Sequence, residues 1–418
     1  MSKNVVHFFF GLIVAAKLFD SVNSRTHPED VKVLRDLKAG IDPKSIVPGS
    51  CLSSWDFSVD PCDNAFGDRF TCGFRCHRAP LGLHRVSEIA LDQVGYSGSL
   101  SSVSWNLRYL QILDIPDNAF YGPVPGSFSG LPALRRLSLS RNKLSGELPA
   151  SLAFLAHLEE LYLDDNHFYG QVPSNFGSLA SLKRLEIQGN RLSGKFPDLS
   201  ALKNLYFLDA SNNRLSGRLP GTLPLSLVEL SMRSNSMEGT LPQNLNNLKL
   251  LQVLDLSHNK LSGPIPSTLF DHPSLQQLEL SHNNFSSLQV PGTMGYTSKL
   301  IAIDLSFNDL RGSLPAFLGS MPKLSALSLE FNKLTGMIPT QYALKAVVPP
   351  GTDRSSLQRL LLGGNYLVGP IPGPLMGLKP GHSNVSLVDN CLYKCPGSLF
   401  FCQGGDQKSS LVCNKFRH

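Results

Sequence analysis

One repeating pattern of leucine, asparagine, glycine and proline limits what this chain can fold into more than any other feature. The clearest copy is Leu251–Pro266, LQVLDLSHNKLSGPIP, with the spacing LxxLxLxxNxLxGxxP. The same spacing recurs mostly every 24 residues and places asparagines at positions 118, 142, 166, 190, 213, 235, 259, 283, 308, 332 and 365. Such a unit cannot bury its own apolar face, so successive units stack around one continuous core.

The residue types in the unit predict its local geometry. Leu254 and Leu256 alternate with Asp255 in a short strand, so the leucines point inward and the aspartate points outward. Asn259 follows at the turn, where a short amide can satisfy buried backbone groups. This is the leucine-rich repeat signature. We therefore predict an α/β solenoid, a leucine-rich repeat superhelix with one concave parallel β-sheet and a ladder of buried asparagines.

Eight cysteines lie outside the repeats and predict a disulfide-stapled cap at each end. Four precede the first repeat and four follow the last: Cys51, Cys62, Cys72, Cys76, Cys391, Cys395, Cys402 and Cys413. Pairing is expected within each group because the repeats separate the two, but each group allows three pairings. The CxxxC spacings leave zinc binding as an alternative. We assign residues 25–85 to the N-terminal cap, 86–390 to about 12 or 13 repeats, and 391–418 to the C-terminal cap.

Residues 1–24 have the features of a secretory signal, with Lys3, an apolar run Val5–Ala16 and SVNS before Arg25. The run is too short to cross a bilayer, and no later stretch approaches the length of a transmembrane helix. We expect a secreted protein of the extracellular space or cell wall, without a membrane span of its own. Asn284 and Asn384 begin Asn-x-Ser sequons and are predicted glycosylation sites.

The interval between Asn332 and Asn365 is longer than the others because of extra residues within 340–356. Two prolines and a glycine in this segment predict an enlarged, exposed loop. A short island that helps to bind a ligand is one interpretation of this loop. We favour the other, a tolerated surface insertion.

Three features together resemble the extracellular leucine-rich repeat proteins of plants. They are a short helix predicted within HPEDVKVLRDLKAGI, the segment CLSSWDFSVDPC, and the LSGxxP turns. That group includes ectodomains of receptor-like kinases, receptor-like proteins and polygalacturonase-inhibiting proteins. The resemblance implies a binding protein whose variable outward strand positions carry recognition. This chain differs in its cap, where DNAFGDRFTCGFRC replaces the shorter CxWxGVxC segment usual in the group.

The outward positions are most varied in the turns that end at Asn142 to Asn235, and bland in the turns that end at Asn259, Asn283 and Asn308. Basic and acidic residues alternate in the varied turns, and aromatic residues and arginines often anchor interfaces. The candidate ligand- or partner-binding residues are Arg136, Arg141, Glu160, Tyr162, Asp164, Arg184, Glu186, Phe207, Asp209, Glu229 and Arg233. A solvated face with incidental charge pairs is the alternative.

The sequence lacks patterns typical of catalysis. It has no glycine-rich phosphate loop and no GxSxG motif, and its histidines have no metal-ligand spacing. His258 and His282 share one outward offset, which places them near enough to stack. Asp255, Glu279 and Asp304 share another, but an open concave sheet offers no cleft for acid catalysis. We predict a protein that is not an enzyme, with no catalytic residue, metal or cofactor.

The predicted function is recognition of a peptide, glycan or protein partner through the concave face, in plant extracellular signalling or defence. A membrane receptor kinase is among the candidate partners. Nucleic acid is not, because the net charge of +6 is mild and no basic stripe accompanies it. The alternative is a soluble inhibitor of pathogen cell-wall-degrading enzymes, similar to the polygalacturonase inhibitors.

Overall fold

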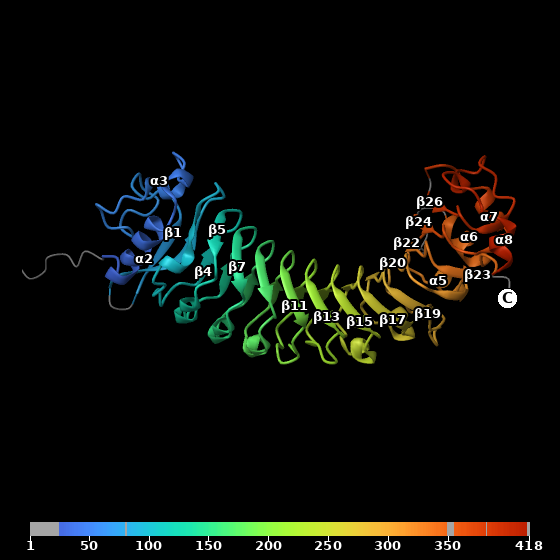
Figure 1. Ribbon diagram of the computed structural model, residues 1–418, viewed down its shortest axis with the longest axis horizontal. Helices are drawn as coiled ribbons and strands as arrows, with labels where there is room; N and C mark the ends of the chain where they lie inside the picture. Colours follow the sequence, from blue (N-terminus) through green and yellow to red (C-terminus); the bar gives the residue numbers. More distant parts are fainter. Residues whose placement is uncertain (1–24, 80–81, 349–354, 382, 416–418) are drawn as a thin grey trace, which may run out of the picture.

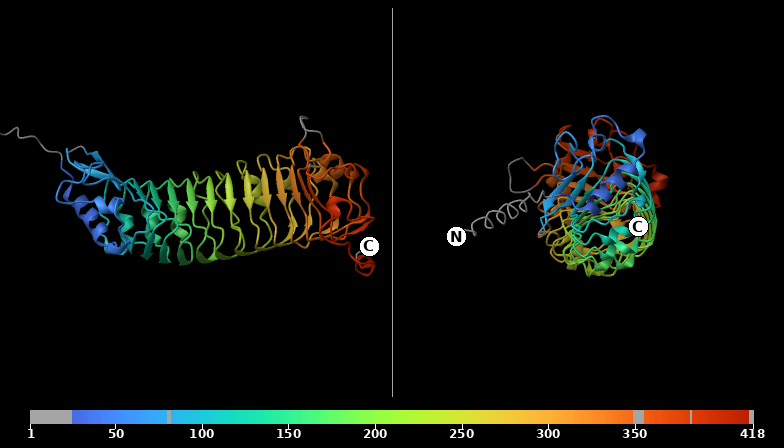
Figure 2. Two further views of the ribbon diagram at one scale, coloured as in Figure 1. Left: turned by 90° about the horizontal axis from the view of Figure 1, so that it is seen from above. Right: turned by 90° about the vertical axis from the view of Figure 1, so that its left-hand side faces the viewer.

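The computed structural model describes residues 25–79, 82–348, 355–381 and 383–415. These residues form a curved solenoid with a cap at each end, and the short helices lie on the outer side of the arc (Figure 1). A view from above shows the parallel strands side by side along its length (Figure 2). The predicted leucine-rich repeat solenoid is confirmed. The expected signal, residues 1–24, lies outside the described residues.

The concave sheet has 14 strands, and all its neighbouring pairs are parallel except β1 with β2. In spatial order the strands are β1 (Phe74–Arg78), β2 (His84–Ala90), β4 (Ile112–Asp114), β6 (Arg136–Ser138), β8 (Glu160–Tyr162), β10 (Arg184–Glu186), β12 (Phe207–Asp209), β14 (Glu229–Ser231), β16 (Val253–Asp255), β18 (Gln277–Glu279), β20 (Ala302–Asp304), β22 (Ala326–Ser328), β24 (Arg359–Leu361) and β26 (Asn384–Ser386). The repeat leucines of these strands are buried in one continuous core.

The asparagine of each turn connects neighbouring turns through its side-chain amide, as the sequence predicts. Asn283 is buried, and its Nδ2 donates to the carbonyls of Leu256, Leu280 and Ser281 at 3.0, 3.2 and 3.2 Å. Its Oδ1 accepts from the backbone N–H of Leu261 at 2.9 Å. Each such asparagine therefore satisfies four backbone groups of neighbouring turns. The predicted burial is not uniform, because Asn213, Asn235, Asn259 and Asn308 are only partly buried.

A second parallel sheet, which the sequence analysis did not predict, follows the asparagine of each turn. Its nine strands are, in spatial order, β19 (Asn284–Leu288), β17 (Lys260–Ile265), β15 (Ser236–Gly239), β13 (Arg214–Gly217), β11 (Arg191–Lys195), β9 (His167–Gly170), β7 (Lys143–Glu147), β5 (Ala119–Gly122) and β3 (Ser97–Ser99). Two further pairs continue the pattern, β21 (Arg311–Ser313) with β23 (Lys333–Thr335) and β25 (Val368–Pro370) with β27 (Cys391–Tyr393). The repeat glycine fits here because its φ is positive, 81° at Gly263, and a Cβ there would lie 2.8 Å from Thr240 Cγ2.

Short helices complete the turns on the convex side. They are η3 (Leu100–Ser102), η4 (Gly126–Gly130), η5 (Ala150–Phe154), η6 (Ser174–Ser178), η7 (Gln243–Asn247), α4 (Ser267–Phe270), α5 (Ala316–Ser320), α6 (Thr340–Ala346) and α7 (Gly373–Met376). The helix α6 corrects the prediction of an exposed loop over 340–356. The first part of this segment forms α6, which lies on the convex side like the short helices of other turns. Its side chains Tyr342, Ala343 and Ala346 are buried in the core. Residues 349–354 lie outside the described residues.

The N-terminal cap contains α2 (Pro28–Ala39), η2 (Pro43–Ser45), α3 (Cys51–Ser54) and the strand β1. Disulfides join Cys51 to Cys72 and Cys62 to Cys76, and Trp55 packs edge-on against Phe74 with ring centroids 5.3 Å apart. A buried ion pair, absent from the sequence predictions, links α2 to the first repeat strand. Arg85 donates to both carboxylate oxygens of Asp30, at 3.0 and 2.7 Å.

The C-terminal cap contains η8 (Phe400–Cys402) and α8 (Ser410–Asn414), with disulfides Cys391–Cys413 and Cys395–Cys402. Pairing within each group is confirmed. Gln407 ends the asparagine ladder by taking the place of the next repeat asparagine. Its Oε1 accepts from the Leu392 N–H at 3.0 Å and its Nε2 donates to the Leu387 carbonyl at 3.1 Å. The last turn therefore leaves these buried backbone groups paired.

Candidate recognition surface

The register of the concave sheet places equivalent residues of successive turns side by side. Arg136, Glu160, Arg184, Phe207 and Glu229 form one column across β6 to β14. A second column beside the first contains Tyr162 on β8, Glu186 on β10 and Asp209 on β12. Strands lie about 4.8 Å apart, so residues separated by roughly 24 positions in the chain contact one another. The structure thus brings together eight of the eleven predicted recognition residues.

Four of these residues, Arg136, Tyr162, Arg184 and Phe207, form what we call the arginine–aromatic cluster. The guanidinium carbon of Arg136 lies 4.7 Å from the centroid of the Tyr162 ring. That of Arg184 lies 5.9 Å from the Tyr162 centroid and 3.5 Å from the Phe207 centroid. Arginine planes and aromatic rings therefore alternate across four neighbouring strands, β6 to β12. Cation–π contacts of this kind hold side chains in place even on a solvated surface.

Two glutamates fix the orientation of the arginines. Arg136 donates to Glu160 at 2.9 Å, and Tyr162 donates its hydroxyl to the same carboxylate at 3.1 Å. Arg184 donates to Glu186, two residues along its own strand. Burial, and then the charge of Glu160, raise the pKa of Tyr162 to about 12, so its hydroxyl keeps its proton at neutral pH. The cluster is a preorganised surface of charged and aromatic groups rather than a set of free side chains.

The other predicted recognition residues occupy different positions. Asp164 is only 3% exposed and accepts a hydrogen bond from the Ser140 hydroxyl, so it supports the sheet rather than facing a partner. Arg141 lies in the turn and pairs with Asp117. Arg233 is exposed beyond the end of β14 and remains available at the surface.

The C-terminal half of the face holds a feature that the sequence analysis missed in part. His258 and His282 stack with ring centroids 4.0 Å apart, which confirms that the pair lies together. The same column continues through Phe307 and Phe331, at 4.2 and 4.4 Å between successive rings. The 24-residue spacing was the signal from which the whole column could have been predicted. The two phenylalanines were missed because they take the place of histidine in turns whose other outward residues are the commonest ones. We call these four residues the ring column.

Acidic residues lie beside the ring column. Asp255, Glu279 and Asp304 are aligned on β16, β18 and β20. Burial and the neighbouring Asp304 raise the pKa of Glu279 to about 7. The described residues hold no group of three or more histidine, cysteine or acidic side chains arranged to bind a metal ion.

The raised pKa of Glu279 predicts a pH-dependent stability effect. At pH values between the ordinary pKa of glutamate and about 7, the carboxyl of Glu279 is ionised in the unfolded chain but still protonated in the folded chain. Its ionisation therefore lowers the stability progressively over this range, and the full loss is present at higher pH. We expect Glu279→Gln to stabilise the protein at pH 8, by about 1 kcal/mol after allowance for solvent screening, and to change nothing at pH 4. Thermal melts at both pH values measure this. An equal effect at the two values would contradict the assignment.

The two predicted glycosylation sites are exposed. Asn284 lies in β19 of the second sheet, and Asn384 lies in β26 at the C-terminal end of the concave sheet. A glycan on Asn384 would therefore border the concave face beside Arg359 of the neighbouring strand.

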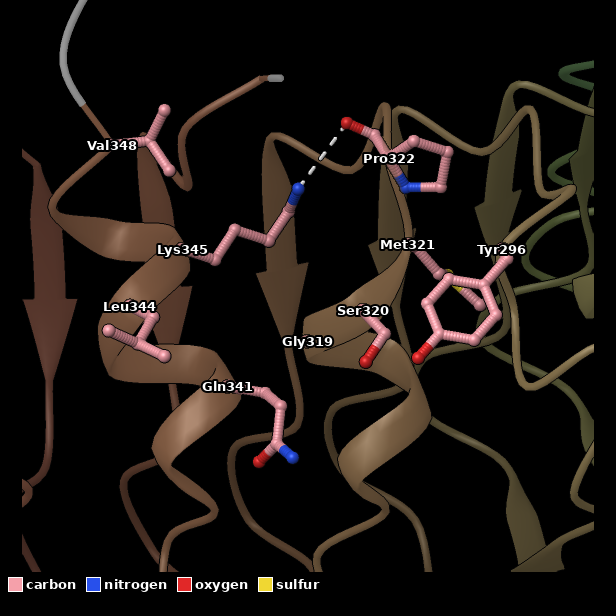
Figure 3. Close-up of a pocket in the computed structure, with 9 residues that line it drawn as sticks. All are labelled: Tyr296, Gly319, Ser320, Met321, Pro322, Gln341, Leu344, Lys345 and Val348. Carbon is pink, nitrogen blue, oxygen red and sulfur yellow. Dashed lines mark hydrogen bonds between the residues drawn. The ribbon is translucent and has the colours of Figure 1, made fainter.

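A hollow of about 350 Å³ lies between α5 and α6, away from the concave strands (Figure 3). Tyr296, Met321, Gln341 and Leu344 are among its lining residues. The amine of Lys345 donates to the Ser355 carbonyl at 2.9 Å and so connects α6 to the chain beyond the inserted segment. These lining residues contain no nucleophile paired with a base, and the arginine–aromatic cluster remains the stronger candidate surface.

This geometry defines the protein as a capped leucine-rich repeat solenoid, and comparison with known proteins places it in the same class. The chain belongs to the leucine-rich repeat family, because residues 94–345 match the model described as "Leucine-rich repeat region". Residues 27–66 match the "Leucine rich repeat N-terminal domain". Neither description is that of a catalytic domain. Among the described residues, no helix is long and apolar enough to cross a membrane.

The chain is similar to plant receptors and to a plant inhibitor. Over 119 residues it is 31% identical to phytosulfokine receptor 1 of Arabidopsis thaliana, covering 28% of this chain and 10% of the receptor. Over 130 residues it is 29% identical to a polygalacturonase inhibitor of Vitis vinifera, covering 31% of this chain and 34% of the inhibitor. The matches thus span about a third or less of these relatives.

A solved structure with the same fold is the plant peptide hormone receptor RGFR1 in complex with RGF2. It superposes with a TM-score of 0.60 at 31% identity, over 71% of this chain and 50% of the receptor chain. The resemblance to plant extracellular leucine-rich repeat proteins is therefore confirmed.

Proposed function

We propose that this protein is an extracellular recognition protein that binds a peptide or protein partner through its concave face. The observation that carries the proposal is the arginine–aromatic cluster. It combines arginine and aromatic side chains, the residue types most often found at the energetic centre of interfaces. Its paired glutamates hold these groups in place before binding, which lowers the ordering cost of association.

The known relatives support a peptide or protein partner. One relative is a phytosulfokine receptor, and a solved structure of the same fold holds a receptor with a peptide hormone. A membrane receptor kinase is a further candidate partner. The signal-like N-terminus, the disulfides and the sequons support secretion to the extracellular space or cell wall.

Inhibition of a cell-wall-degrading enzyme is the second candidate function. It is favoured by the match to the Vitis vinifera polygalacturonase inhibitor, of which the matched segment covers 34%. In both functions the concave face contacts a protein or peptide, but the partner differs.

Two assays on the purified chain separate these functions. Incubation with plant extracellular fluid, followed by mass spectrometry of what stays bound, should recover a peptide or receptor under the first function. A polygalacturonase assay should then show no inhibition. Stoichiometric inhibition of a fungal polygalacturonase would replace the first function by the second.

A further inference from the structure

The backbone position that carries the ring column is left-handed in every turn. The φ values are 54° at His258 and His282 and 52° at Phe307 and Phe331. In most other turns the same position holds residues that tolerate this conformation or form local hydrogen bonds, such as Asp117, Asn212 and Gly189. Arg141 is an exception, and it pairs with Asp117 of the preceding turn. A bulky phenylalanine is disfavoured there, so backbone preference does not explain two of them in consecutive turns.

Burial does not explain them either. Phe307 is 42% exposed and Phe331 is 49% exposed. The rings cover one another's faces, and the column ends against Gly364, where a Cβ would lie 2.6 Å from Phe331 Cδ1. The outer edges of the stacked rings are left open to solvent along four turns. Strained residues that stay exposed are a recognised mark of function.

The acidic residues beside these rings have a cation near them in Arg359, whose charge acts on Glu279 and Glu330 without forming an ion pair. Within the described chain, Asp255, Glu279, Asp304 and Glu330 take part in no ion pair, unlike the arginines and glutamates of the N-terminal half. Asp255 and Asp304 instead accept from the backbone N–H groups of Ser257 and Ser306, at 3.0 and 2.9 Å. These bonds hold the two carboxylates in place, where they can meet a cation on a partner.

We infer that the ring column and these four carboxylates form a second docking track on the concave face, for a peptide segment in which basic side chains alternate with aromatic or aliphatic ones. The basic groups would pair with the carboxylates. The apolar groups would cover the ring edges, in the edge-to-face arrangement that aromatic groups prefer. The track deepens the proposed function, because it assigns a ligand chemistry to a separate part of the same face.

Charge complementarity decides the class of occupant. The track presents carboxylates and apolar edges, so it repels an anionic chain and attracts a cationic one. A neutral glycan would leave the carboxylates without a counter-charge. A second copy of this chain would have to present a basic, apolar segment of its own, and it would make binding depend on protein concentration.

The test uses the full chain at pH 8, above the raised pKa of Glu279, and a fluorescent peptide of alternating lysine and phenylalanine. We expect binding at low salt that weakens as salt rises, and binding about tenfold or more weaker when serine replaces phenylalanine or glutamate replaces lysine. The double variant Phe307→Asn/Phe331→Asn should weaken binding by about tenfold while keeping the fold, because asparagine suits a left-handed position. Glu279→Gln/Asp304→Asn should have a similar effect.

Phe154→Asn is the matched control, since Phe154 is exposed on the convex helix η5. It should leave peptide binding unchanged. The pair Arg184→Ala/Phe207→Ala should also leave it unchanged, which separates failure of this inference from failure of the proposed function. Unchanged binding by the Phe307→Asn/Phe331→Asn variant would overturn the docking track. Equal binding of the glutamate peptide would do the same. So would concentration-dependent self-association of the original chain that disappears in the Phe307→Asn/Phe331→Asn variant, because the occupant would then be a second copy.

Discussion

Replacing Asn283 by alanine should lower the free energy of unfolding by about 3 kcal/mol, because four backbone groups lose their partner inside the coil. A buried carbonyl or N–H without a hydrogen bond costs far more than an exposed one. Denaturant unfolding followed by circular dichroism measures the change. The effect should be similar at Asn190, which makes the corresponding bonds in its own turn.

Asn247→Ala is the control, because Asn247 is exposed in the convex helix η7. It should change the stability by less than about 0.5 kcal/mol. Equal losses at Asn283 and Asn247 would show that the ladder does not stabilise the solenoid.

Asp30→Ala should destabilise the N-terminal cap by about 3–5 kcal/mol, the usual cost of leaving one partner of a buried ion pair alone. The carboxylate of Asp30 is fully buried, and it also accepts from the Val86 N–H at 2.8 Å. Loss of this carboxylate leaves the Arg85 guanidinium and that N–H without a partner. The cap covers the end of the core, so the first repeats should unfold at lower denaturant concentration.

Asp36→Ala provides a matched comparison on the same helix, since Asp36 pairs with Lys32 at the surface. Such an exposed pair contributes about 0.5 kcal/mol or less. Hydrogen exchange in β2 and β4 should accelerate in Asp30→Ala and remain unchanged in Asp36→Ala. Similar exchange in both variants would contradict the role assigned to Asp30.

The parts of the fold that repeat could be predicted from the sequence. Leu254, Asn259 and Gly263 each have a local physical reason for their position, and the period places equivalent residues in neighbouring turns. The second sheet was missed because its strands are short and contain glycine, which is unfavourable in strands. The helix α6 was missed because prolines and a glycine further along 340–356 dominated the interpretation.

The caps could be predicted only in outline, because they have no internal period. Asp30 and Arg85 are 55 residues apart, and nothing local indicates that they meet. Gln407 ends the ladder from a segment with no repeat pattern. For the concave face, the sequence predicted which residues are neighbours. It did not predict that Arg136 and Arg184 would be held between aromatic rings and glutamates, because that depends on side-chain conformations.

The proposed recognition of a partner by the concave face depends on the arginine–aromatic cluster. Calorimetric titration of the partner recovered from extracellular fluid tests it directly, with the original chain, Arg184→Ala/Phe207→Ala, and Lys195→Ala on the second sheet. We predict a loss of about 2 kcal/mol or more in the double variant, roughly 30-fold in affinity, and no change in Lys195→Ala. Undiminished affinity in the double variant would contradict the claim.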